Sequence, residues 1–231
     1  MILDSVTRFL QAFYRLTGVE PEDPSLSHTG EAENEVAFLA LTRGAWAAQR
    51  HMLRMGYTGW RKRSDPISWT DGGTDGGKVA TLPEDFLRAF GRQERGRSAL
   101  VDSQGRRWGS ELDAEDSHRE GRFYYIDGTQ IRLTRRNNAP PGLRLDYHYR
   151  HPKFNDELPD EEIVFPIEAR PLVVAEAANI AANESWLPGD ELSHQKIQRA
   201  AMLAREEARH VSRTTKQPRQ MRRAPRFGNR W

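Results

Sequence analysis

The spacing of apolar residues predicts two helices near the start of the chain. Between residues 2 and 16, apolar side chains recur every three or four positions, which places them on one face of a helix. Residues 31–55 repeat this spacing, and their early glutamates favour the positive end of a helix dipole. Gly56 and Gly59 mark the end of this second helix. Its predicted apolar stripe consists of Val36, Ala40, Leu41, Ala48 and Met52.

Helical spacing returns after Pro166. One segment continues to Leu187, and Pro171 suits a position in its first turn. Pro188 and Gly189 interrupt the pattern, and residues 190–211 predict a further helix. The apolar side of this last helix is rich in alanine and consists of Ile197, Ala200, Ala201, Ala204, Ala208 and Val211.

The middle of the chain, from residue 57 to 165, has the period of strands and turns. Its clearest element is the segment GRFYYIDGTQIRL at residues 121–133. An Asp127-Gly128 pair between alternating runs predicts a hairpin with a type I′ turn, which needs positive φ at both central residues. In that register, Tyr124 faces Ile131 and Ile126 faces Thr129.

A third strand is predicted at residues 143–149. Leucines and tyrosines at the odd-numbered positions alternate there with Arg144, Asp146 and His148. Strict alternation predicts one buried face and one wet face, which is typical of an antiparallel sheet.

These patterns together predict an α+β fold that is mainly α. We expect a small antiparallel helix bundle, with a β-rich insertion between its second and third helices and an extended C-terminal tail. The predicted segments are 1–56 (N-terminal helices), 57–165 (insertion), 166–211 (C-terminal helices) and 212–231 (tail).

The distribution of charge separates the tail from the rest of the chain. The 231 residues include 35 basic and 33 acidic side chains, a formal net charge of +2. Seven of the basic residues and none of the acidic ones lie in residues 212–231. The body is therefore mildly acidic, and the tail is strongly basic.

Sequence patterns for catalysis or cofactor binding are weak. Without cysteine, the chain has no thiol nucleophile and no Cys-based zinc site. Residues 72–78 (GGTDGGK) resemble a P-loop, but Val79 stands where a Ser or Thr would hold magnesium, and a hairpin tip is the better interpretation. His148 and His151 would point to opposite faces of a strand, which disfavours a shared metal. We therefore predict no catalytic, cofactor or metal site and a protein that is not an enzyme. No apolar stretch is long enough to predict a membrane span.

The tail combines arginines with two aromatic residues near its end. Arginine and aromatic side chains commonly anchor protein interfaces, and such a segment can become ordered on binding. An acidic protein groove and nucleic-acid phosphate both fit the charge. We favour the protein groove because the tail ends on a bulky aromatic. The candidate binding residues are Arg219, Arg222, Arg223, Arg226, Phe227, Arg230 and Trp231.

The order of several motifs resembles the head–tail adaptor proteins of tailed bacteriophages, also called connector or head-completion proteins. The resemblance covers about residues 1–213 and is firmest over residues 79–182. It is carried by TLPEDFLR (81–88), FYYIDGTQIRL (123–133), LRLDYHYRHPKF (143–154), Phe165-Pro166 and VVAEAANIAA (173–182).

This resemblance implies a structural role in the virion, at the interface between head and tail, after assembly in the host cytoplasm. It implies a ring of twelve copies beneath the portal protein, contact with a downstream tail or nozzle protein, and phage DNA passing through the lumen without sequence specificity. It also implies that the C-terminal segment docks onto the portal. We further expect the last helix, with its alanine-rich stripe over residues 190–211, to bury surface against neighbouring subunits and not only within one chain.

Two other classes of function stay open at this point. A small DNA-packaging protein could use the basic tail to bind nucleic acid, with strong dependence on salt. An enzyme of an unrecognised type is the third hypothesis.

Overall fold

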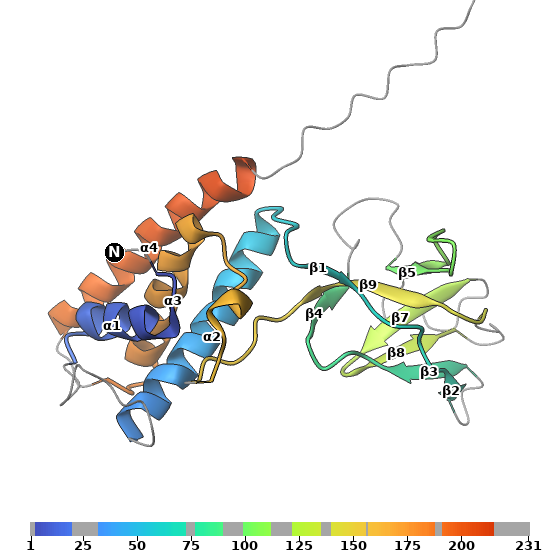
Figure 1. Cartoon of the computed structure of the whole chain (residues 1–231), viewed down its shortest axis with the longest axis horizontal. Coiled ribbons are helices and arrows are strands. Elements are labelled where there is room, and N and C mark those ends of the chain that lie inside the picture. Colours follow the sequence, from blue (N-terminus) through green and yellow to red (C-terminus); the bar gives the residue numbers. More distant parts are fainter. Residues whose placement is uncertain are drawn as a thin grey trace, which may run out of the picture. The chain divides into compact units, whose positions relative to one another are not determined.

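The computed structural model describes residues 3–19, 32–72, 77–89, 99–111, 122–134, 140–155, 157–187 and 191–214. The chain divides into two compact units. The helical unit comprises the described residues of 1–58, 154–160 and 165–231, and the β unit comprises those of 59–153 and 161–164. All the described strands lie between the second and third α-helices in sequence (Figure 1). The chain is therefore an α+β protein, as predicted.

The described part of the helical unit is built around its third helix. Its elements are α1 (Val6–Thr17), α2 (Ala32–Arg54), α3 (Arg170–Asn183) and α4 (Glu191–Thr214), with the short 3-10 helix η4 (Ile167–Ala169) packed against α3 and α4. Another short 3-10 helix, η3 (Asp160–Glu162), spans a boundary in sequence between the two units. The other three α-helices all pack against α3. Nine of the 14 residues of α3 are buried, because a helix that is covered on all sides needs apolar residues all round.

A glycine sets the close approach of α2 to α3. A Cβ atom on Gly44 would lie 2.6 Å from the Ala177 nitrogen and from the Val173 oxygen. Nothing larger than hydrogen fits between these two backbones. The helix pair therefore depends on Gly44 although glycine lowers the intrinsic stability of a helix.

The predicted helix ends shift where capping residues intervene. α1 begins at Val6 because Ser5 takes an extended backbone and accepts a hydrogen bond from the Arg8 nitrogen. It ends where Gly18 adopts a left-handed backbone, with φ at +74°. α3 ends at Asn183, before the predicted Leu187, and Ser185 follows with a φ of +58°. In α2 the stripe is buried as predicted except at Val36, which is exposed.

The last helix corrects the expected start of the tail. α4 extends to Thr214, so residues 212–214 belong to the helix, and Ser212 is fully buried and donates to the Ala208 carbonyl. Within the chain, α4 packs on α3 and buries Ala201, Ala204 and Ala208 of the alanine-rich stripe. Burial of further surface of this helix against neighbouring subunits stays a prediction.

The β unit contains two sheets that share one core. The first has the order β1-β9-β4, with β5 also paired to β9, and the second has the order β2-β3-β8-β7-β6. Neighbouring strands are antiparallel except the β6–β7 pair. Trp108, Tyr124, Ile131 and Tyr147 are among the buried side chains of the core. The strands are β1 (Arg61–Arg63), β2 (Thr70–Asp71), β3 (Lys78–Thr81), β4 (Phe86–Ala89), β5 (Leu100–Val101), β6 (Ser110–Glu111), β7 (Phe123–Asp127), β8 (Gln130–Leu133) and β9 (Arg144–Tyr149).

The predicted hairpin is present, in a register shifted from the predicted one. β7 pairs with β8 so that Asp127 faces Gln130, and the two-residue turn is Gly128-Thr129. Gly128 has a φ of +57°, and neither flanking residue has positive φ. The turn therefore has glycine at its first central position, as in type II′, because a β-branched threonine does not tolerate positive φ. As a result Tyr124 faces Leu133, and Ile126 faces Ile131.

Of the three polar residues predicted to form a wet face of β9, only Arg144 is exposed. Asp146 and His148 are only 3% and 7% exposed. The strand lies in the middle of its sheet, with β1 on one edge and β4 and β5 on the other. Arg61 and Arg63 of β1 bind Asp146 and help to cover it.

Candidate interaction surfaces

The tail residues singled out from the sequence lie outside the described residues. This applies to Arg219, Arg222, Arg223, Arg226, Phe227, Arg230 and Trp231. The described chain ends at Thr214, at the C-terminal end of α4. Whatever the tail binds, it leaves the helical unit from this helix end.

The P-loop-like segment lies at a hairpin. Asp71 in β2 pairs with Lys78 in β3, and the Lys78 ammonium lies 2.6 Å from the Asp71 carboxylate. Residues 73–76 between them lie outside the described residues. The lysine that would contact phosphate in a P-loop is here bound to an aspartate, in agreement with the hairpin interpretation.

The histidines singled out from the sequence are both buried. Burial, with the neighbouring Arg88 and Arg61, lowers the pKa of His148 to about 4, so this side chain is neutral at physiological pH. Across the described ranges no group of three or more His, Asp or Glu side chains has an arrangement that could hold a metal ion.

The outer side of α4 exposes large apolar side chains. Leu192, Met202 and Leu203 are 73%, 63% and 54% exposed, whereas Ile197 on the α3 side is buried. η4 packs against the same helix and exposes Ile167. Exposed Arg199 and Glu206 lie next to the apolar residues of α4 on the same side of the helix, so these stand among charged ones. Three large apolar side chains exposed on one helix make this side a candidate surface for binding another protein.

A buried ion pair fixes α4 against α3. Both nitrogens of the Arg205 fork contact the Glu176 carboxylate, at 2.5 and 2.8 Å. Glu176 is almost fully buried, and the Arg205 side chain is 40% exposed. Because this two-point contact is directional, it sets which residues of α4 face outward.

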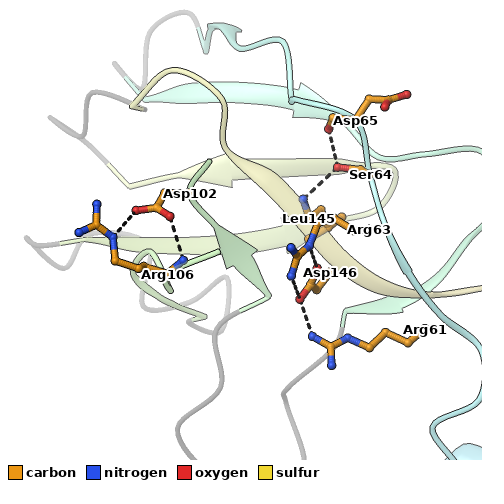
Figure 2. A network of polar contacts seen from close by, with 8 residues as sticks. All are labelled: Arg61, Arg63, Ser64, Asp65, Asp102, Arg106, Leu145 and Asp146. Atoms are coloured by element: carbon orange, nitrogen blue, oxygen red, sulfur yellow. Dashed lines mark hydrogen bonds and ion pairs between the residues drawn. The ribbon is translucent and has the colours of Figure 1, made fainter. Parts of the chain in front are cut away.

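The β unit carries a second polar cluster, on the face of β9 that the sequence predicts to be wet. The Asp146 carboxylate accepts hydrogen bonds from Arg61 at 2.7 Å and from Arg63 at 2.6 and 3.1 Å (Figure 2). Burial alone would raise the pKa of Asp146, but the hydrogen bonds from Arg63 and Arg61 outweigh it and hold the pKa below its ordinary value. Asp146 is therefore an anion held between two arginines, and it fixes both of them.

The opposite face of β9 borders a cavity of about 750 Å³. There the Asp85 carboxylate accepts hydrogen bonds from the Tyr147 hydroxyl at 2.6 Å and from the Lys62 ammonium at 2.7 Å. Burial and the Asp85 carboxylate raise the pKa of Tyr147. These two hydrogen bonds tie Asp85, in the β3–β4 loop, to β9 and β1.

No protein-family model matches the chain, and no curated protein matches it at a significant level. Among the described helices, none is both long and apolar enough to cross a membrane.

Proposed function

We propose that the chain is a structural head–tail adaptor of a tailed phage and not an enzyme. In this proposal, copies of the chain form a ring of twelve beneath the portal protein, join the DNA-filled head to a downstream tail or nozzle protein, and continue the DNA channel within the virion. The four helices would act as a small antiparallel bundle, with the β unit as an insertion between the second and third of them.

The exposed apolar side of α4 is the observation that best supports this proposal. The alanine side of α4 is covered by α3, and the Glu176–Arg205 pair holds the helix in register. Leu192, Met202 and Leu203 nevertheless remain exposed. A helix that packs on its own chain by one side and exposes three large apolar side chains on the other is suited to assembly with further subunits.

The position of the tail supports an attachment role. The tail continues the chain from the C-terminal end of α4. Residues 212–231 hold seven cationic residues together with Phe227 and Trp231. Arginine forks would pair with carboxylates of the portal, and the two aromatics would fill pockets. In a ring, many weak contacts of this kind add up to durable attachment.

The assembly surface can be tested with charge variants on α4. Met202→Glu combined with Leu203→Glu places two carboxylates on the exposed apolar side. Gln11→Glu combined with Asn155→Asp, at two exposed positions of the helical unit outside α4, is the control with the same added charge. Each protein is co-expressed with the portal protein encoded in the same genome, and particles are examined by electron microscopy and native mass spectrometry.

We expect the wild type and the control to form rings on the portal, and the Met202/Leu203 variant to form none although its circular dichroism is unchanged. Portal rings of normal occupancy with that variant would contradict the role of this surface. A wild-type stoichiometry unrelated to that of the portal would contradict the adaptor proposal itself.

The tail has a separate test, whose boundary the structure sets. Deletion must begin at residue 215, because Ser212 is buried in the last turn of α4. The protein lacking residues 215–231 should keep its fold but lose attachment to the portal, giving heads that leak DNA or lack tails. Normal joining of heads and tails by the truncated protein would show that the tail is not the anchor.

A further inference from the structure

One face of the β1–β9–β4 sheet concentrates arginines from several strands. Arg61 and Arg63 in β1 both bind Asp146, so all three lie on the same face. Arg144 lies two residues before Asp146 in β9, and alternate residues of a strand share a face. Its side chain is exposed, and among the described residues it has no hydrogen-bonding or ionic partner.

Two more arginines extend this face at its edges. Arg88 in β4 is paired with His148 and lies close enough to lower the pKa of that histidine. The backbone of Arg107 forms an isolated antiparallel β-bridge with Val101, and Val101 is paired with Arg144 in β9. Residues that are directly opposite each other in paired strands share a face, so Arg107 and Arg144 lie on the same side. We call the set Arg61, Arg63, Arg88, Arg107 and Arg144 the arginine face.

The arginine face carries a net positive charge. Asp146, which the strand register places among the five arginines, is 3% exposed and is already bound by two of them. His148 adds no charge, because burial lowers its pKa to about 4. Lys62 lies on the other face of the sheet. The excess is positive in a body whose overall charge is mildly negative, so it does not follow from composition.

The geometry of the arginine face suits phosphate. A guanidinium presents its donors in a rigid fork that matches phosphate oxygens, and every cation of this face is an arginine. The buried Asp146 holds the side chains of Arg61 and Arg63 in place, which reduces the loss of side-chain entropy on binding. The strand positions that carry the face contain no phenylalanine, tyrosine or tryptophan, so it lacks the stacking platform that single-strand binders use.

We propose that the arginine face binds the phosphate backbone of a nucleic-acid duplex, without reading its sequence. This surface lies in the β unit and not on α4 or the tail, so the inference stands even if the adaptor proposal fails. Binding would release counterions, so that the logarithm of the association constant falls linearly with the logarithm of the salt concentration.

The test uses the full-length protein, a fluorescent 20-base-pair DNA duplex of random sequence, and a salt titration followed by anisotropy. Arg88→Gln combined with Arg144→Gln removes two cations that hold no acidic partner within the described ranges. Arg54→Gln combined with Arg199→Gln, at exposed positions of α2 and α4, removes the same charge from the helical unit. The tail is present in all three proteins, so its contribution to the salt dependence cancels.

Loss of two phosphate contacts should make the slope of the logarithm of the association constant against the logarithm of the salt concentration shallower by about 1.8. When the salt falls from 1 M to 0.1 M, the Arg88/Arg144 variant should therefore gain roughly sixtyfold less affinity than the wild type. The Arg54/Arg199 control should bind like the wild type, and all three proteins should give the same unfolding curve in urea.

Three outcomes would overturn the proposal. Equal slopes for the two double variants would mean that only net charge matters. Tighter binding of a single strand of the same length would exclude a duplex site. Binding of poly-glutamate, but not of duplex DNA, that disappears in the Arg88/Arg144 variant would assign the face to an acidic protein instead.

Discussion

Substitution of Gly44 by alanine tests the packing of the helical unit at its tightest point. The added Cβ would lie 2.6 Å from the Ala177 nitrogen and the Val173 oxygen, and 2.7 Å from the Ala177 Cβ. Carbon atoms in contact are normally about 3.5–4.0 Å apart, so α2 and α3 would have to separate by roughly 1 Å. Val173 and Ala177 are fully buried, and two of the three clashing atoms belong to the backbone, so no side chain can turn away.

Two effects of opposite sign set the size of the change. Overpacking of a tight core costs about 1–3 kcal/mol, and separation of the helices also loosens the contacts of Leu41 and Ala48. Alanine in a helix interior restores about 1 kcal/mol relative to glycine. Three contacts at 2.6–2.7 Å place the cost at the upper end of its range, so we expect a net loss of about 2 kcal/mol for Gly44→Ala. The loss should be larger for Gly44→Val, which lacks most of the propensity gain and adds more volume.

Urea unfolding followed by circular dichroism at 222 nm reports mainly on the helices and measures this change. A second variant identifies the cause. Ala177→Gly in the Gly44→Ala background removes the clashing Cβ but leaves both backbone clashes, so it should not restore stability. A Gly44→Ala protein as stable as the wild type, or full rescue by Ala177→Gly, would refute the argument from backbone contact.

Two further predictions concern the β unit. Gly128→Val should destabilise the β7–β8 hairpin by about 1–2 kcal/mol because valine is strained at positive φ, whereas Thr129→Val, at the next turn position, should cost much less in the same urea titration. The pKa of His148 is about 4 when folded and about 6.5 when unfolded, so below pH 6.5 the unfolded chain binds a proton that the folded chain does not. The free energy of unfolding should therefore be highest above pH 6.5 and fall by up to roughly 3 kcal/mol as the pH falls to 4. In the His148→Gln variant the urea midpoint should change less with pH over this range. A wild-type urea midpoint that does not change between pH 4 and pH 6.5 would contradict a lowered pKa for His148 in the folded protein.

The sequence alone determined the kind of each main element, because that information is local. Helical spacing predicted α1 to α4, and the Asp-Gly signal together with alternation predicted the hairpin and β9. Glycine with positive φ at position 128 followed from the same signal, because backbone strain depends on a residue and its neighbours. The concentration of positive charge in the tail is likewise a property of the sequence, and what the tail binds stays a prediction.

Tertiary structure decided which faces of these elements meet solvent. Asp146 reads as a wet position in an alternating strand, but it is buried because β1 places Arg61 and Arg63 over it. Helical spacing places the alanines of α4 on one side, but only the structure shows that α3 covers this side and that Met202 and Leu203 stay exposed. The physical reason is the same in both cases. Periodicity shows which residues of one element lie together, whereas burial depends on which other element, distant in sequence, packs against them.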